Sequence, residues 1–411
     1  MTHLPNIVSR SLLHLSSHMD KTGPSAISRV MAAVAERKRN GKKVIGLHVG
    51  EPDFDTPDHI KEAAIRAVQA GDTHYTAPDG SPAMKEAVQH KFHRDYDLKI
   101  ELNEIVIAPG AKTLIFMALF ATLDRGDEVI LPAPYWGSYI DIIEMMGATA
   151  VVVPTRPEDA FRLHADDLEK AITPRTRWLL LNSPSNPSGT VYELEHYVPL
   201  LDVLENHPHV WLLADDMYEH IVYDDVKFVT PSQIRPNLRS RMLTVNGVSK
   251  AYAMTGWRIG YAVGPAALMQ AIVAIISQST SCACSIAQAA AAEALLGTQD
   301  VVERYRLEYA ERRELVIRDL NAIPGLSCIA PKGAFYAFVD WKKLMGKTTE
   351  AGECLRTDEE FCRYLLDEYG VGVVPGAPFG APGYFRVSFA GAIPVLSEGM
   401  ALLRTACAAL A

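Results

Sequence analysis

Residues 247–261 read Gly247-Val-Ser-Lys250-Ala-Tyr-Ala-Met-Thr-Gly-Trp-Arg258-Ile-Gly-Tyr261, with a lysine and an arginine eight residues apart. Lysine forms Schiff bases with carbonyl compounds, and a lowered pKa makes it a nucleophile at neutral pH. The planar fork of arginine suits phosphate, because it donates two parallel hydrogen bonds. An aldehyde that also carries a phosphate would need both side chains. Taken alone, however, Lys250 reads equally as a solvated surface lysine.

The rest of the chain sets the class of protein. Its 411 residues exceed the size at which one core keeps growing, which predicts two domains. The net charge of -9 argues against a general nucleic-acid binder. The sequence shows neither the apolar run of about 20 residues that a membrane helix needs nor the layout of a signal peptide. We therefore expect a cytoplasmic protein without nucleic-acid or membrane partners.

The cysteines give no sign of a disulfide framework or a metal site. The chain has six, at positions 282, 284, 328, 354, 362 and 407. The first two are spaced C-x-C, and no histidine pair or second cysteine pair follows at zinc-site spacing. Free thiols in a reducing cytoplasm, with no bound metal, are the expected state.

Around the 247–261 stretch the chain alternates between apolar runs and helical patterns. Seven runs stand out, at 105–108, 128–131, 149–153, 178–181, 210–214, 242–245 and 259–263. Uninterrupted Val/Ile/Leu runs between helices indicate a mostly parallel sheet that is covered on both faces. The sequence therefore predicts an α/β fold, with a large domain over residues 56–295.

The two ends of the chain have a different character. The N-terminal part predicts a helix, a short strand and a second helix, at 25–39, 44–50 and 59–70. After about residue 290 the sequence predicts a long charged helix at 301–321, strands at 334–339, 371–374 and 384–389, and helices at 358–369 and from 394 onward. We expect a smaller α+β domain over 296–411, which the N-terminal segment 1–55 joins.

In an open parallel sheet, ligands bind outside the carboxyl ends of the strands. Five of the apolar runs are followed there by residues with suitable chemistry. They are the glycine turn Gly110-Ala111-Lys112 at a helix start, Trp136, Asn186, the pair Asp215 and Tyr218, and Lys250. Each alone has a plain structural reading, such as a helix start or a core aromatic. Their convergence on one edge favours a ligand site.

The acid in this set has a specific use. A carboxylate beneath a pyridine ring keeps the ring nitrogen protonated, which turns the ring into an electron sink. Asp215 stands nearest the strand end, and Asp216 is the alternative acid. Together with an aldehyde and a phosphate, a pyridine ring describes pyridoxal 5′-phosphate.

The chain resembles the class I pyridoxal-phosphate-dependent aminotransferases of fold type I, in their bacterial aspartate-aminotransferase-like branch. The resemblance runs from about Pro24 to the C-terminus and is most specific at 249–260, around Lys250. Residues 182–189, 50–57, 132–139 and 373–376 match as well. It implies a transaminase that moves an amino group from an L-amino acid to a 2-oxo acid, with pyridoxal 5′-phosphate as cofactor.

The resemblance assigns a role to each matched residue. Lys250 would hold the cofactor as a Schiff base and move the proton, while Asp215 pairs with the ring nitrogen. The ring's phenolic oxygen would bond Asn186 and Tyr218, and Trp136 would stack on the ring. Around the phosphate would lie Gly110, Ala111, Lys112, Arg258 and, from a neighbouring subunit, Tyr75. That last contact implies a homodimer with shared sites. The substrate α-carboxylate would meet Arg386, with Gly50, Asn186 and Trp136 nearby.

The amino donor follows less directly from the match. Aspartate with 2-oxoglutarate is the default of the family, and members that prefer dicarboxylates often carry a basic residue just before the Pro-Ser at the first helix. Here Gly23 stands at that place, and Ile27 stands where threonine is usual. Lys21 would replace the missing cation only with a backbone shift. A neutral or aromatic donor is therefore the other expectation.

Other functions fit the same residues less well. A pyridoxal-phosphate-dependent carbon–sulfur β-lyase is an alternative on the same scaffold, because fold does not settle reaction. A ligand-sensing regulator would need a DNA-binding module, and about twenty residues before the matched region are too few for one. His48 and His74 lie in expected site loops and read as structural histidines.

Overall fold

Seven strands form the central sheet of the computed structural model, which describes residues 16, 19 and 23–411. In chain order they are β2 (Ile105–Ala108), β3 (Glu128–Ala133), β4 (Thr149–Pro154), β5 (Thr176–Asn182), β6 (Trp211–Asp215), β7 (Met242–Gly247) and β8 (Gly260–Val263). Each coincides with one of the seven apolar runs, so that prediction is confirmed. The spatial order is β2-β8-β7-β6-β5-β3-β4.

One strand departs from the parallel arrangement. β8 runs antiparallel to both of its neighbours, β2 and β7, whereas the other pairs are parallel. A parallel return needs a crossover of a dozen or more residues, usually a helix. Residues 248–259 instead form turns around Lys250, with a short helical turn at Thr255–Trp257. The chain therefore comes back along β7 in the opposite direction.

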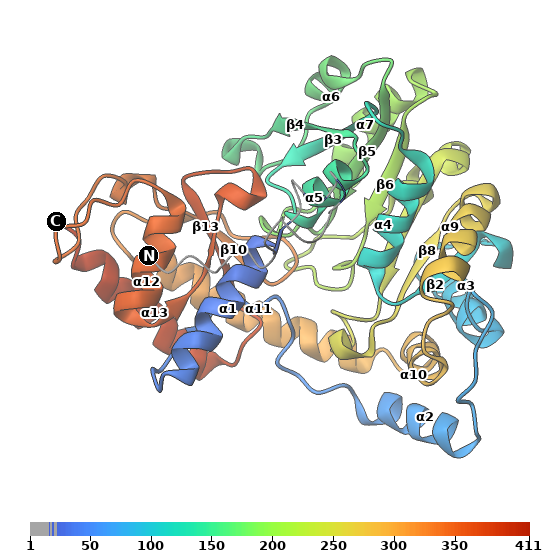
Figure 1. Ribbon diagram of the computed structural model, residues 1–411, viewed down its shortest axis with the longest axis horizontal. Helices are drawn as coiled ribbons and strands as arrows, with labels where there is room; N and C mark the ends of the chain where they lie inside the picture. Colours follow the sequence, from blue (N-terminus) through green and yellow to red (C-terminus); the bar gives the residue numbers. More distant parts are fainter. Residues whose placement is uncertain (1–15, 17–18, 20–22) are drawn as a thin grey trace.

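Helices cover both faces of this sheet, as the unbroken apolar runs predict (Figure 1). Alternate residues of β5 show the two faces: Leu180 packs in one core cluster, and Leu179 and Leu181 pack in the other. The first face carries α4 (Ala111–Thr122), α5 (Ser138–Met145) and α9 (Ala266–Ser279). The second carries α6 (Ala165–Ala171), α7 (Leu194–Asn206) and the short α8 (Pro231–Ile234).

A second, smaller sheet lies toward the C-terminus. It is antiparallel, in the order β12-β13-β10-β9. Its strands are β9 (Ser327–Cys328), β10 (Tyr336–Asp340), β12 (Val374–Pro375) and β13 (Tyr384–Ser388). The surrounding helices are α11 (Asp300–Asn321), α12 (Asp358–Tyr369) and α13 (Ile393–Ala408). The sequence placed the starts of all three helices to within a residue, but the last helix ends at Ala408 and not at the chain end.

The N-terminal segment is built into this C-terminal part of the fold. After α1 (Ala26–Arg39), strand β1 (Ile45–Gly46) pairs in parallel with β11 (Val371–Gly372). Ser388 N–H then donates to the carbonyl of Leu47 over 2.7 Å. The chain continues into α2 (Asp58–Gln69) and α3 (Pro82–Tyr96), which pack on α10 (Ser285–Leu296). Within the described part of the chain, no helix has both the length and the apolar character to cross a membrane.

Candidate active site

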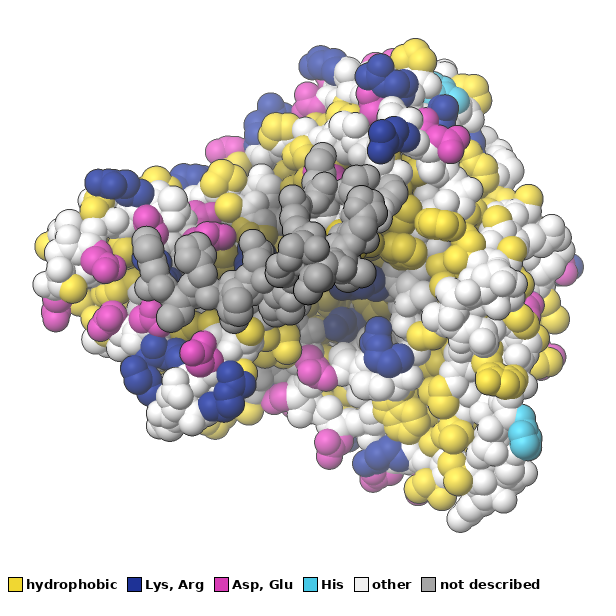
Figure 2. Space-filling model, in the orientation of Figure 1, with side chains coloured by type: hydrophobic (Ala, Val, Ile, Leu, Met, Phe, Trp, Pro, Cys, Tyr) yellow, Lys and Arg dark blue, Asp and Glu magenta, His cyan; other side chains and the backbone are white. Residues whose placement is uncertain are grey.

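A pocket of about 380 Å³ opens at the carboxyl ends of the parallel strands, beside α1 and the start of α4. Figure 2 shows this region as a hollow in the middle of the face, with Lys and Arg side chains inside it. The sequence-predicted residues that line it are Gly50, Ala111, Lys112, Trp136, Asn186, Asp215, Tyr218, Lys250, Arg258 and Arg386. Residues from five strand ends and from β13 are therefore brought to one place.

Asp215 is the buried acid of the pocket. It ends β6, and its Oδ2 accepts a hydrogen bond of 2.6 Å from the hydroxyl of Tyr139. Burial raises the pKa of the Asp215 carboxyl, and the bonds from Tyr139 and from Met217 N–H oppose that rise. Asp216 is also buried but does not line the pocket. The position nearer the strand end is therefore the one that faces a ligand.

Lys250 lies in the turns after β7 and points at the loop that carries Gly50. Its Nζ donates to the carbonyl of Gly50 over 2.7 Å. Burial lowers the pKa of Lys250 to about 8, and the nearby Arg386 and Arg258 guanidinium groups act in the same direction. The neutral, nucleophilic amine is thus within reach near physiological pH.

Arg386 is the most buried cation in the pocket, with 1% of its surface exposed. Its two terminal nitrogens donate to Asn186 Oδ1 and to the carbonyl of His48, each over 2.8 Å. Its Nε has no partner among the described residues. A buried guanidinium that pairs with no carboxylate in the described part of the chain is suited to an incoming anionic group. His48 contributes through its backbone, and burial lowers the pKa of its ring to about 4.

The start of α4 forms a cradle against the turn that carries Arg258. Gly110 has a positive φ of 90°, and a Cβ there would lie 2.3 Å from an Arg258 guanidinium nitrogen. A Cβ on Gly260 would lie equally close to the backbone nitrogen of Ala111. Only glycine fits at both positions. The free N–H groups of a helix start and a guanidinium beside them suit phosphate.

Two further predicted residues occupy distinct places. Lys112 places its Nζ 4.6 Å from the centre of the Trp136 ring, at the open side of the pocket. Tyr75 is 89% exposed and is not among the described residues that line this pocket. Within one copy of the chain, the loop at 71–80 therefore adds nothing to the site.

The mouth of the pocket is formed by α1. Ser25, Ile27, Ser28 and Met31 all line it. Gly23 has open space around its Cα and does not line the pocket, and Lys21 lies outside the described residues.

Several lining residues escaped the sequence analysis. Tyr139 was detectable, because it lies three residues after Trp136 within the matched stretch 132–139. Tyr336 had no such signal, since a tyrosine that opens an apolar strand reads as core. Glu51, Thr255 and Met217 also line the pocket, and Glu51 accepts a hydrogen bond from the Thr255 hydroxyl.

These residues fit pyridoxal 5′-phosphate. The cradle excludes a Cβ at Gly110 and offers backbone N–H groups with Arg258 for a phosphate. Lys250 has the depressed pKa that an aldehyde-capturing amine needs, and Asp215 offers a buried acceptor for a ring N–H. Arg386 is left for the carboxylate of a second molecule.

Comparisons with known proteins agree with this chemistry. The family model for aminotransferase class I and II matches residues 42–396. The aspartate aminotransferase of Rhizobium meliloti (strain 1021) is 52% identical over 95% of this chain and 96% of its own length. The aspartate/prephenate aminotransferase of Cereibacter sphaeroides is 49% identical over 96% and 99%.

Solved structures give the same result. The crystal structure of the Rhizobium meliloti aspartate aminotransferase superposes with a TM-score of 0.94 at 52% identity, covering 97% of this chain and 100% of that one. The Thermus thermophilus aspartate aminotransferase with maleate has a TM-score of 0.89 at 37% identity, with coverage of 96% and 100%.

Proposed function

The chain belongs to the class I and II aminotransferases, and we propose that aspartate is its amino donor and 2-oxoglutarate the acceptor. The protein is a pyridoxal-phosphate-dependent transaminase, as its relatives are. The relatives support this activity and not the carbon–sulfur lyase alternative. The finer assignment to aspartate rests on one observation: Lys112 is an exposed cation of the pocket, in addition to Arg258 beside the phosphate cradle and the buried Arg386.

The cofactor supplies an aldehyde that exchanges amino groups and a ring that accepts electrons. The chain's own groups do the rest. Lys250 would hold the cofactor and, with its Nζ, would move the proton of the substrate Cα. Asp215, oriented by the Tyr139 hydroxyl, would keep a proton on the ring nitrogen. Asn186 and Tyr218 would bind the phenolic oxygen, and Trp136 would lie against the ring.

Four cations line the pocket among the described residues, and we divide them between the aldehyde, the phosphate and the two carboxylates of the donor. Lys250 serves the aldehyde, Arg258 with Gly110 and Ala111 serves the phosphate, and Arg386 serves the α-carboxylate. In contrast to the phosphate role that the sequence suggested for Lys112, we assign its amine to the distal carboxylate. Lys112 is exposed at the open side of the pocket, and glycine stands at position 23, where a basic residue is frequent in dicarboxylate-preferring members.

A donor panel tests this assignment. Purified, cofactor-loaded protein would be mixed with aspartate, glutamate, alanine, valine, phenylalanine or kynurenine, and the single-turnover loss of the chromophore recorded. We expect aspartate and glutamate to react fastest. Lys112→Met should slow these two by roughly tenfold and leave phenylalanine unchanged, because only the charge-assisted bond is lost.

Lys99→Met is the matched control, because this lysine is exposed and lies outside the pocket. Fastest reaction with neutral or aromatic donors, together with unchanged rates in Lys112→Met, would overturn the aspartate assignment. That outcome would assign the apolar side chains Ile27, Met31 and Ile115 as the specificity wall.

We propose that the active unit is a homodimer in which Tyr75 of one copy reaches the phosphate of the other. Its support is the exposure of Tyr75 away from its own pocket, next to α2 and its exposed Ile65 and Val68. Mixing inactive Tyr75→Ala with inactive Lys250→Ala should restore activity, because hybrid dimers contain one intact site. A mixture no more active than its components would contradict shared sites.

The domain limits are proposed as 1–55, 56–295 and 296–411. The pairing of β1 with β11 supports placing the N-terminal segment with the C-terminal domain. We also propose a cytoplasmic location. All six cysteines, each within the described residues, are free thiols, and burial raises the pKa of Cys328 and Cys407 to about 12. Such thiols stay protonated and unreactive in a reducing compartment.

A further inference from the structure

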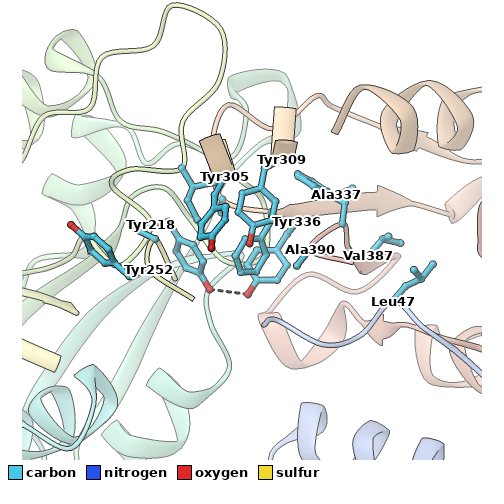
Figure 3. Packing of buried hydrophobic residues seen from close by; sticks show 14 of the residues in the cluster. Leu47, Tyr218, Tyr252, Tyr305, Tyr309, Tyr336, Ala337, Val387 and Ala390 are labelled. Atoms are coloured by element: carbon cyan, nitrogen blue, oxygen red, sulfur yellow. Dashed lines mark hydrogen bonds between the residues drawn. The ribbon is translucent and has the colours of Figure 1, made fainter. Parts of the chain in front are cut away.

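Tyr336, the first residue of β10, lies in the pocket without a role from the sequence. Only 1% of its surface is exposed. Its hydroxyl oxygen is 2.8 Å from that of Tyr218, and either oxygen can be the donor (Figure 3). The two rings meet edge to face, with centroids 5.7 Å apart. Tyr336 is therefore the direct neighbour of the residue expected to bind the phenolic oxygen of the cofactor.

The same side chain contacts two other parts of the site. The Arg386 guanidinium lies 4.4 Å from the centre of the Tyr336 ring, which is the geometry of a cation–π contact. Gly50 lies against the hydroxyl, since a Cβ there would be 2.4 Å from Tyr336 Oη. The carbonyl of Gly50 in turn accepts from Lys250. Tyr336 thus contacts Tyr218, Arg386 and the glycine whose carbonyl binds Lys250.

The hydroxyl pair holds a fixed number of protons. Burial raises the pKa of Tyr218 well above its ordinary value and also raises that of Tyr336, although the Arg386 charge opposes the rise in Tyr336. Both phenols are therefore neutral near pH 7, with one proton each. If Tyr218 donates its proton to an oxygen anion in the pocket, its bond to Tyr336 has one remaining direction. Tyr336 must then be the donor.

We propose that Tyr336 is a positioning residue for transamination, which donates to the Tyr218 hydroxyl and supports the Arg386 guanidinium with its ring. The inference rests on the proposed roles of Tyr218 and Arg386. A hydroxyl that accepts a hydrogen bond becomes a better donor, because chains of hydrogen bonds polarise one another. Tyr336 would strengthen the hold of Tyr218 on the phenolic anion without touching the reacting atoms.

The test uses the chromophore of the cofactor-loaded protein rather than its turnover. An anion that is held less well favours the protonated chromophore, so its spectroscopic pKa should rise. In Tyr336→Phe we expect a rise of roughly 0.3 unit, smaller than in Tyr218→Phe. In the Tyr218→Phe background, the added Tyr336→Phe change should produce no further rise. Equal shifts in both backgrounds, or none in either, would overturn the inference.

The ring contact has its own variant and readout. Maleate is a dicarboxylate probe without an amino group, and its dissociation constant can be measured by spectral titration. Tyr336→Phe keeps the ring, so binding should stay within about twofold of the wild type. Tyr336→Leu removes the ring, and we expect binding about five- to tenfold weaker. Wild-type affinity in Tyr336→Leu would contradict the support of Arg386.

Removing any buried tyrosine hydroxyl could disturb the fold, and a control must separate that effect from the proposed positioning role of Tyr336. Tyr364→Phe is the matched control, because its buried hydroxyl donates to the carbonyl of Ala406 and does not line the pocket. It should leave the chromophore pKa unchanged. If the wild type shows no titrating chromophore, the proposed function itself fails. If the wild type titrates and Tyr336→Phe overlays it, only the role of Tyr336 fails.

Discussion

The floor and the mouth of the pocket are built differently. The floor consists of Asp215 at the end of β6, Tyr139 on the first turn of α5 and Lys250 in the turns after β7. Asp215 and Tyr139 bond to each other, and Lys250 bonds to the carbonyl of Gly50. The mouth consists of Ile27, Met31 and Lys112; Met31 is 50% exposed, and Lys112 is exposed as well. The floor is therefore held by the sheet, whereas the mouth depends on how α1 and the start of α4 lie over it.

This difference suggests a division of work, in which the floor carries out the reaction and the mouth selects the substrate. With the proposed roles, amine exchange needs Lys250 and Asp215 whatever the donor, so we expect the floor to serve every donor. We expect charge and shape at the mouth to select the side chain of the donor. Changes to the floor should stop the chemistry, while changes to the mouth should move preference between donors.

The largest effect is expected from Lys250→Ala. Turnover should fall by more than about 10⁴-fold, because the variant loses both the amine that holds the cofactor and the group that moves the proton. The absorbance of the lysine-bound chromophore should vanish as well. Lys99→Ala, an exposed lysine outside the pocket, serves as the control. Normal turnover in Lys250→Ala would show that Lys250 does not carry the reaction.

Arg386→Lys should come next. The substitution keeps a positive charge but loses the planar fork that binds a carboxylate through two bonds. It also leaves Asn186 Oδ1 and the His48 carbonyl to compete for one ammonium group. We expect kcat/KM for aspartate to fall by about 100-fold, mostly through KM. A fall confined to kcat would mean that Arg386 acts in the chemistry instead of substrate binding.

The next effect concerns the rate at which cofactor-free protein binds the cofactor, which we expect to change about tenfold per pH unit. The pKa of Lys250 is lowered to about 8, so its neutral form appears at lower pH than that of an ordinary lysine. The rate of chromophore formation in cofactor-free protein should increase about tenfold per unit below that value and then level off. A rate that still climbs at the same slope near the ordinary lysine pKa would show that the amine is not buried when it reacts.

The smallest effect is expected at the mouth, from Gly23→Lys. A Cβ at Gly23 would have no described atom within 4 Å, so the backbone there accepts a side chain. Its ammonium group would form an exposed ion pair with a distal carboxylate, and such pairs are weak. We expect KM for aspartate to fall up to about fivefold, with phenylalanine unaffected. A larger gain for phenylalanine than for aspartate would show that α1 does not lie over the distal carboxylate.

The sequence brought two floor residues, Asp215 and Lys250, to the pocket because each follows a strand, but it missed Tyr139. A buried strand has a readable pattern, and in a parallel sheet its end is where a ligand binds. Lys250, Asp215 and Asn186 were found in this way. The direction of β8 was missed, since an apolar run gives a strand but not its orientation.

The mouth and the neighbours of the floor were less predictable. Tyr336 comes from β10, in a different sheet, and only tertiary packing brings its hydroxyl against Tyr218. The place of Lys112 above the Trp136 ring also depends on packing. Local sequence patterns predict individual helices and strands. They do not predict which side chains of two separate sheets come into contact.

The bond between Arg386 and the His48 carbonyl joins residues 338 positions apart. During synthesis, the residues of the floor leave the ribosome long before β11 and β13 exist. The early segment with β1 lacks its partner strand until the last part of the chain is released, so we expect this contact late in folding. The pocket therefore receives its most buried positive charge last, because Arg386 follows every other charged residue among the described residues that line it.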